Sequence, residues 1–233
     1  MNEIGGLALA TAAFVGTHLA LSHPLRIRLV GALGESAFVL AYSLVAILSL
    51  GWMIWAYRGI NVSLPLWIAP DWWWQAAAAI LLLASILLAG SLIGNPAFPR
   101  PGASLRAPRQ AKGVFAITRH PMNWAFMLWA MVHISLWGSP RNLIVAGGIL
   151  LLALAGSIGQ DRKKRALLGT PWREWEARTS FVPFAALLTG RASWRNAAPG
   201  WTAVLGGLVF WLAVTWYHAP NVSPVAALLG SSS

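Results

Sequence analysis

The sequence predicts an all-α integral membrane protein, a polytopic helical bundle with about six transmembrane helices. Hydrophobic residues make up 58% of the 233 residues and charged residues only 10%. A soluble domain carries roughly 25% charged residues, so this chain has too few to cover a water-facing surface. The same composition excludes a disordered chain. Because the chain has no cysteine, disulfides, thiolate metal sites, iron–sulfur clusters and a cysteine nucleophile are excluded as well.

Six apolar runs approach the roughly 20 helical residues that cross about 30 Å of hydrocarbon. Since they are continuous and do not alternate, they favour helices over barrel strands. The predicted spans are Ile4–Leu21, Ser36–Tyr57, Trp72–Gly94, Met122–Trp137, Leu143–Gly159 and Trp201–Tyr217. The first run has no basic residue before it, so we interpret it as a membrane helix and not as a signal peptide. The fourth and fifth are short and closely spaced, which predicts a tight helical hairpin.

Basic residues concentrate on one side of the predicted bundle, in the segments after the first, third and fifth runs. Only Arg58 and Arg141 fall on the other side. By the positive-inside rule the basic side is cytoplasmic, and both termini are non-cytoplasmic. The net charge of +11 then reflects topology and contact with lipid phosphates. We expect membrane lipid as a partner and no nucleic acid.

The two longer cytoplasmic segments are Asn95–Pro121 and Gln160–Gly200. In the first, Pro96, Pro99, Pro101 and Pro108 predict an irregular loop. In the second, Trp172 and Trp175 alternate with charged residues at helical spacing, which predicts a short helix in the headgroup layer. On this topology nearly all of the 15 tryptophans fall in two interfacial belts.

Two histidines, His18 and His133, lie deep in the predicted spans, which hold no Asp, Glu, Lys or Arg in their interior. Ionisable groups in a membrane are functional candidates because they are costly to desolvate. Imidazoles inside a bundle can ligate haem iron or another transition metal. Alternatively, each imidazole only bonds a hydroxyl or carbonyl group. Because His133 is predicted about 17 Å from the face near His18, His120 or His23 is the alternative second ligand.

The segment Thr118–Trp124 combines a cation with a helix start. Pro121 suits the first helical position, so free backbone N–H groups follow it. With Arg119 they predict an anion site, suited to a haem propionate, the carboxylate of S-adenosylmethionine or a lipid phosphate. We place His120 and Asn123 in the same candidate cofactor site. The alternative is a helix cap with Arg119 touching lipid headgroups.

Trp129 is the one tryptophan predicted to lie deep, one helical turn before His133. It is a candidate wall of the cofactor site, with core packing as the alternative. Asp161 and Glu176 are acids near the predicted bundle. They either bind an amino group or pair with Arg119 and the neighbouring cations, and we favour pairing.

Several motifs resemble the NnrU family in their order along the chain. They are Gly16–Ala20, Leu25–Arg26, Leu33–Glu35, Tyr42–Val45, Thr118–Pro121 and Trp129–His133. The resemblance covers about residues 7–190, before a last helix at about 201–217, and we expect residues 1–233 to form a single domain. NnrU proteins are bacterial membrane proteins named from nitric-oxide and denitrification metabolism, so the resemblance implies the bacterial inner (cytoplasmic) membrane.

The NnrU family is similar to plant zeta-carotene isomerase, an integral membrane haem b protein that isomerises a cis double bond. The resemblance implies haem b, with His18 and His133 at the positions of the proposed ligands. It also implies redox or isomerase-like chemistry on a lipid-soluble substrate. The isomerase has a cysteine where this sequence has Ala130, so a redox-linked ligand exchange on that thiol is excluded here.

A second resemblance is to membrane methyltransferases of the isoprenylcysteine carboxyl methyltransferase type. It rests on Arg119–Pro121 near a helix start and on Phe181–Pro183, and it implies S-adenosylmethionine at this entry, held partly by Glu176. Gln160–Asp161 stands where that family shows paired Glu. The alternatives to a haem protein are therefore a membrane methyltransferase and a non-enzymatic accessory factor of a respiratory complex. The sequence names neither the substrate nor the oligomeric state.

Overall fold

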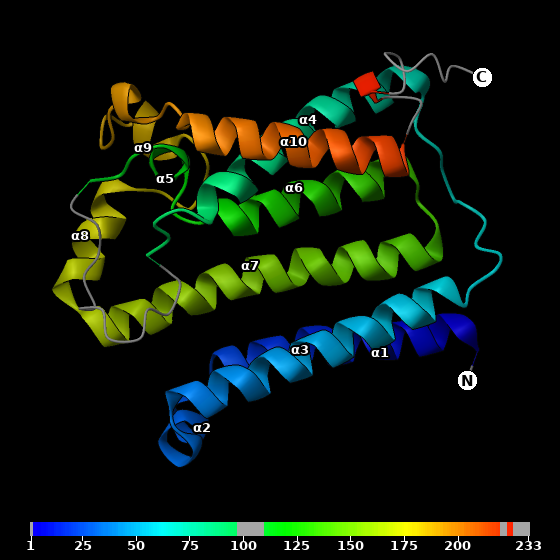
Figure 1. Cartoon of the computed structure of the whole chain (residues 1–233), viewed down its shortest axis with the longest axis horizontal. Coiled ribbons are helices and arrows are strands. Elements are labelled where there is room, and N and C mark those ends of the chain that lie inside the picture. The colour runs from blue at the N-terminus through cyan, green and yellow to red at the C-terminus, as the bar shows by residue number, and fades with distance from the viewer. Residues whose placement is uncertain (1, 97–109, 220–222, 226–233) are drawn as a thin grey trace. The chain divides into compact units, whose positions relative to one another are not determined.

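The computed structural model describes residues 2–96, 110–219 and 223–225, and within these ranges the regular elements are all helices, beside one isolated bridge (Figure 1). The all-α prediction is confirmed. The chain divides into two compact units, each built from two separate stretches. Unit 1 comprises Met1–Ala69 and Ala130–Gly159, and unit 2 comprises Pro70–Trp129 and Gln160–Ser233.

Unit 1 is built around α1 (Glu3–Ser22) and α3 (Glu35–Arg58), which pack side by side (Figure 1). The side chain of Asn2 caps α1 by accepting a hydrogen bond from the Gly5 N–H at 2.8 Å. Between them, α2 (Arg26–Leu33) forms a short helix where the sequence predicted only a connecting segment. The apolar core of the unit consists of Leu7, Ala10, Phe14, Val15, Met53 and Ile60.

Unit 2 pairs α4 (Asp71–Ser91) with α10 (Trp201–His218), which run side by side (Figure 1). Their backbones approach closely at Gly207, where a Cβ atom would lie 2.6 Å from Cα of Ile86. The shorter helices of the unit are α5 (Val114–Ile117), α8 (Thr170–Arg178), α9 (Ala185–Leu188) and the 3₁₀ helix η1 (Trp194–Asn196).

The predicted hairpin is formed by α6 (Pro121–Leu136) and α7 (Pro140–Leu168), and prolines open both helices. The turn between them is held by backbone hydrogen bonds from Leu66 to Gly138 and from Gly138 to Trp67. The sequence placed the end of the second helix at Gly159, and the structure corrects this to Leu168. The residues after Gly159 are too polar to extend an apolar run, but Arg, Lys, Ala and Leu are good helix formers.

Four helices are long and apolar enough to cross a membrane: α1, α3, α4 and α7. The chain is therefore a multi-pass membrane protein by the length and composition of its helices. The other two predicted spans, α6 and α10, form helices of 16 and 18 residues. Arg100, Arg106 and Arg109 belong to the basic residues predicted on the cytoplasmic side after the third run. They and most of the predicted irregular loop lie outside the described residues.

Helix α8 forms as predicted, but the expectation that it lies in the headgroup layer through its tryptophans is wrong. Trp172 and Trp175 are each only 1% exposed and belong to the core of unit 2. They pack with Val114 and Phe115 of α5, and the Trp175 ring lies 6.5 Å from that of Phe115. The apolar face of this helix therefore serves protein packing and not lipid contact.

Candidate functional sites

His18 lies half-buried on α1, and its imidazole has a fixed orientation. Nδ1 lies 2.8 Å from the backbone oxygen of Phe14. Because a carbonyl only accepts hydrogen bonds, Nδ1 carries the proton and Nε2 keeps its lone pair. Histidines that ligate metals are commonly oriented in this way, with one ring N–H donating to a carbonyl. The donor set of His18 therefore fits a haem ligand.

Aromatic side chains hold the imidazole of His18 from two sides. Its ring centroid lies 4.3 Å from that of Phe14 and 5.6 Å from that of Tyr42, which meets it edge-on. Tyr42 in turn lies 6.2 Å from Phe38, and the guanidinium of Arg26 sits 5.2 Å above the Phe38 ring. This packing restricts rotation of the imidazole, which is what a ligand position requires.

The second predicted ligand, His133, is half-buried on the part of α6 that belongs to unit 1. Asn142 anchors the helix there by donating to the backbone oxygen of His133 at 3.0 Å. The alternative His23 is packed against α7, because a Cβ atom on Gly159 would lie 2.5 Å from its Nε2. Nε2 of His23 therefore lies close to the backbone of α7, and the choice of His133 as the second ligand stays a prediction.

Trp129, a predicted wall of the haem site, and Ala130, where the isomerase has a cysteine, both lie on α6. Ala130 is completely buried, and Trp129 is half-buried. Over the described ranges, no three or more of His, Asp and Glu gather as a metal site. Haem needs only two histidine ligands, which is fewer than the three residues counted here. Haem ligation is therefore not tested and stays a prediction.

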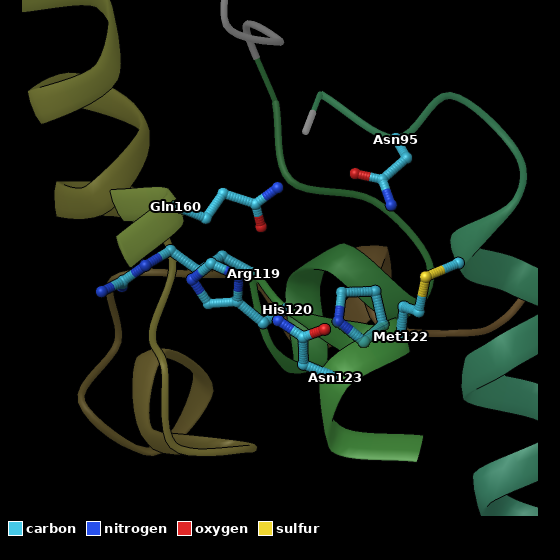
Figure 2. A pocket seen from close by; sticks show the side chains of 7 residues that line it. Asn95, Arg119, His120, Met122, Asn123 and Gln160 are labelled. Atoms are coloured by element: carbon cyan, nitrogen blue, oxygen red, sulfur yellow. The ribbon is translucent and has the colours of Figure 1, made fainter. Parts of the chain in front are cut away.

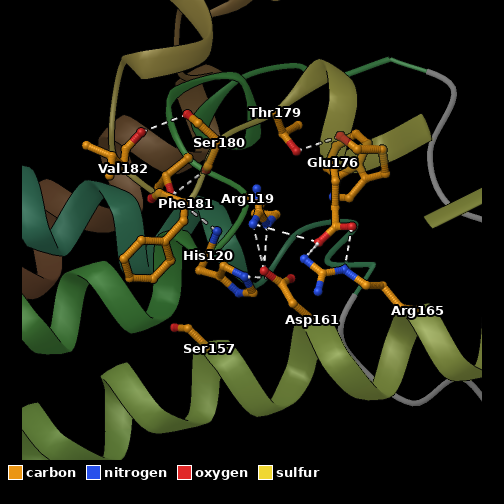
Figure 3. Close-up of polar contacts among 12 residues, drawn as sticks. Arg119, His120, Ser157, Asp161, Arg165, Glu176, Thr179, Ser180, Phe181 and Val182 are labelled. Atoms are coloured by element: carbon orange, nitrogen blue, oxygen red, sulfur yellow. Dashed lines mark hydrogen bonds and ion pairs between the residues drawn. The ribbon is translucent and has the colours of Figure 1, made fainter. Parts of the chain in front are cut away.

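The candidate anion site of unit 2 is an ion-pair network (Figure 3). Arg119 donates through Nε to Oδ2 of Asp161 at 2.9 Å, and its Nη2 lies 2.7 Å from the same oxygen. The guanidinium also lies 3.8 Å from Glu176, which accepts two hydrogen bonds of 2.7 Å from Arg165. Nε2 of His120 lies 2.9 Å from Oδ1 of Asp161. Two arginines and one histidine therefore share two carboxylates.

Backbone contacts to the segment after α8 place Arg119 and His120. The N–H of Arg119 donates to the Ser180 oxygen at 2.9 Å. Phe181 offers its backbone oxygen to two donors, Thr118 Oγ1 and Trp124 Nε1, each at 2.7 Å. Helix α6 thus starts against this segment, and the side chains just before Pro121 are aimed at α7.

A small pocket of about 50 Å³ opens beside the network (Figure 2). Its walls come from Asn95 after α4, Gln160 of α7 and the start of α6, and the lining residues are Asn95, Arg119, His120, Pro121, Met122, Asn123 and Gln160. Sites for drug-sized ligands measure roughly 300–1,000 Å³. This pocket therefore admits a polar group of a ligand and not a whole haem or S-adenosylmethionine.

Comparison with known proteins identifies the family. The model of the NnrU protein family matches residues 6–224. This chain belongs to the NnrU family. It is also similar to the chloroplastic 15-cis-zeta-carotene isomerases of Zea mays and Arabidopsis thaliana, with 32% identity to each over 80 residues. That alignment covers 34% of this chain and 22% of each isomerase, so the chain spans only about a fifth of their length. No solved structure matches significantly.

In this NnrU family member the favoured interpretation of the two acids is confirmed, since Asp161 and Glu176 both pair with arginines. Sequence reasoning missed Arg165 and the pairing of His120 with Asp161. It ended the fifth helix at Gly159, and a helix that continues places Asp161 and Arg165 one turn apart on the same face. Helical periodicity carried past the apolar run is the signal that would have found Arg165.

Proposed function

We propose that this protein binds haem b in the membrane and performs redox or isomerase-like chemistry on a lipid-soluble substrate. Family membership and the similarity to two zeta-carotene isomerases support this class of function. The observation that carries the haem proposal is the hydrogen bond from Nδ1 of His18 to Phe14, which leaves Nε2 as a lone-pair donor. A link to nitric-oxide or denitrification metabolism is part of the proposal through the family name.

His18 and His133 would hold the iron of the haem. Bound haem would supply one-electron redox chemistry at that iron. The protein's own part is to orient His18 through the Phe14 carbonyl and the edge of Tyr42, and to surround it with apolar side chains. The apolar faces of the helices would admit a lipid-soluble substrate directly from the bilayer.

The cofactor-binding role proposed for Arg119, His120 and Asn123 concerns the carboxylate of a propionate. The pocket that these residues line has room for such a group. Arg119 already contacts two carboxylates, so a propionate would share its charge with them. Trp129 is proposed as an apolar wall of the cofactor site, since tryptophan offers a large flat surface.

An absorption spectrum of the purified protein reconstituted with haem tests this function. We expect a Soret band that is lost in His18→Ala and strongly reduced in His133→Ala. His23→Ala is the matched control and should keep the band, because the His23 ring packs against Gly159. A wild-type protein without a Soret band overturns the proposal. If that protein also bound S-adenosylmethionine in calorimetry, and Arg119→Ala abolished this binding, the methyltransferase alternative would be supported.

The isomerase-like chemistry needs its own assay, because Ala130 excludes ligand exchange on a thiol at that position. The haem-loaded protein is incubated with a cis-polyene in lipid vesicles, in oxidised and reduced form, and the isomers are separated by chromatography. We expect faster conversion than with His18→Ala protein in the same vesicles. Equal rates for the two proteins would exclude haem-dependent isomerisation of that substrate.

We further propose six spans, α1, α3, α4, α6, α7 and α10, with both termini on the non-cytoplasmic side of a bacterial inner membrane. The chain has no cysteine, so single cysteines report topology without background. Ser63→Cys in the α3–α4 connection should react with a membrane-impermeant thiol reagent added to intact cells. Ser193→Cys, before η1, should react only after the cells are opened. The reverse pattern would invert the topology, and equal labelling of both would exclude an odd number of spans between them.

A further inference from the structure

We propose that His120 and Asp161 form a proton-accepting pair that binds the head group of a carboxylic acid in the pocket at the start of α6. The acid transfers its proton to Nδ1 of His120 and remains bound as a carboxylate beside the imidazolium. This deepens the binding role proposed above for His120, but it does not require haem.

The hydrogen bonds of Asp161 determine which nitrogen of His120 is the base. Arg119 donates to Oδ2 of Asp161 at 2.9 Å, and Nε2 of His120 lies 2.9 Å from Oδ1. A carboxylate bound to a guanidinium is ionised and can only accept, so the Nε2 position carries the proton. In the neutral imidazole Nδ1 is then the unprotonated nitrogen. In the Ser-His-Asp triad of hydrolases, an aspartate likewise fixes the tautomer of the histidine, and the other ring nitrogen takes a proton.

His120 is almost completely buried, yet it contributes to the wall of the pocket. Its side chain is 2% exposed and lines the pocket together with Asn123 and Gln160. Among its other contacts, the backbone N–H lies near Thr118, the backbone oxygen accepts from the Trp124 N–H, and the ring lies against Phe181. None of these contacts occupies Nδ1, so Nδ1 is the ring nitrogen that a ligand O–H in the pocket would meet.

The charges of the network favour an acid that brings its own proton. The cations of Arg119 and Arg165 balance the carboxylates of Asp161 and Glu176. A bare anion, the propionate proposed above included, would have to share the charge of Arg119 with both carboxylates. A neutral acid adds no charge, and transfer of its proton leaves two new opposite charges in contact.

The start of α6 supplies donors for the second oxygen of the acid. Pro121 has no N–H, so Met122 carries the first backbone donor of the helix, at the positive end of its dipole. A carboxylic acid presents one O–H donor and one C=O acceptor side by side. Nδ1 of His120 can accept from the O–H of the acid, and the first backbone N–H groups of α6 can donate to its C=O. An alcohol has no C=O group and would use only the first of these two contacts.

The size of the pocket limits the ligand to its head group. A volume of about 50 Å³ holds a few water molecules or one carboxyl group. The remainder of the ligand lies outside the pocket. The acid can therefore be a small soluble carboxylic acid or the head of a fatty acid from the membrane, and the test separates these two sources.

Nitrogen NMR of the full chain, labelled with ¹⁵N-histidine and purified in a neutral detergent without added haem, tests the proposal. The His120 signals are assigned by their loss in His120→Gln. We expect a proton on Nε2 of His120 in the free protein, and a shift of Nδ1 to the position of a protonated nitrogen on titration with acetic acid or with oleic acid at constant pH. A response to acetate indicates a soluble acid as the source, and a response to oleate alone indicates a membrane acid.

His218→Gln is the matched control, because His218 is exposed at the end of α10 and its loss should leave the His120 response unchanged. His120→Gln should weaken acid binding by about tenfold or more, as expected for a lost hydrogen bond to a charged group. A proton on Nδ1 in the free protein overturns the proposal, and so does an Nδ1 signal that neither acid shifts. Because no haem is present, these results are independent of the Soret band.

Discussion

The two units hold a histidine in opposite ways. In unit 1, His18 donates from Nδ1 to a backbone carbonyl and is packed between Phe14 and Tyr42. In unit 2, His120 is bound through Nε2 to a carboxylate within a network of five charged or ionisable side chains. The first arrangement leaves Nε2 for the proposed metal ligation, beside aromatic side chains. The second leaves Nδ1 for the proposed proton transfer, beside charged side chains.

The difference teaches that the partner of one ring nitrogen decides the chemistry of the other. A carbonyl partner adds no charge, so His18 depends on packing for its orientation. A carboxylate partner couples His120 to two arginines, and its surroundings become sensitive to the loss of any one charge. The following substitutions test this contrast, beginning with the largest expected effect.

Asp161→Ala should destabilise the protein by about 3–5 kcal/mol, because it leaves Arg119 partly buried without its main counter-charge. Glu174→Ala is the control, since Glu174 pairs with Arg178 at the surface. Its loss should cost less than about 1 kcal/mol. Denaturant titration in micelles, followed by circular dichroism, measures both. Equal losses would show that the network of unit 2 is not more strongly coupled than a surface ion pair.

His120→Phe and His18→Phe compare the two histidines directly in the haem-free protein. His120→Phe should cost about 1.5–3 kcal/mol, because Asp161 loses a buried hydrogen bond to a charged group. His18→Phe should cost less than about 1 kcal/mol, because it loses one hydrogen bond to a carbonyl and keeps the aromatic packing. The same denaturant titration ranks them, and the reverse order would contradict the contrast between the units.

Gly207→Ala tests the close packing of α4 and α10 in unit 2. A Cβ at this position would lie 2.6 Å from Cα and 2.7 Å from N of Ile86. Because these are backbone atoms, the contact cannot be relieved by a change of side-chain rotamer. Overpacking should outweigh the higher helix propensity of alanine, with a net loss of about 1–2 kcal/mol. The adjacent Gly206→Ala, whose Cβ would lie 3.5 Å from that of Ala89, should lose nothing. A thermal melt of both variants distinguishes packing from propensity.

Gly148→Ala tests close helix packing in unit 1, and it has the smallest expected effect of these substitutions. Its Cβ would collide with the methyl group of Thr11, but that side chain can rotate. The clash and the gain in helix propensity should nearly cancel, within about 0.5 kcal/mol. Gly147→Ala meets no atom within 4 Å and serves as the reference in the same thermal melt. A loss as large as that of Gly207→Ala would show that both units pack with the same rigidity.

The sequence predicted the helices well, because apolar runs and helix-starting prolines are local signals. Pro121 begins a helix as expected, whereas the fifth run was predicted to begin at Leu143 and its helix begins at Pro140. The pairing of Asp161 and Glu176 with arginines was also predictable, since few acids face many cations in this chain. These features depend on the composition of the chain and on residues close together in the sequence, and both can be read from a single sequence.

The environment of α8 and the partner of His120 were not predictable in the same way. A helix with Trp172 and Trp175 on one face fits a lipid interface and a protein core equally well, and only the tertiary structure shows their burial. The bond between His120 and Asp161 joins residues 41 positions apart, so no local pattern encodes it. The tautomer of His18 depends on one hydrogen bond within its own helix, which spacing permits but does not require.

The length of α7 links the ion network to the thickness of the bilayer. Along this helix, the 21 steps from Pro140 to Asp161 rise about 32 Å, close to the hydrocarbon thickness of an ordinary membrane. A thicker bilayer would draw Asp161 and its partners into hydrocarbon, and a thinner one would expose apolar turns to water. Hydrophobic mismatch of this kind sorts proteins among membranes. The charged turn of α7 would therefore limit how far this helix can sink into a bilayer.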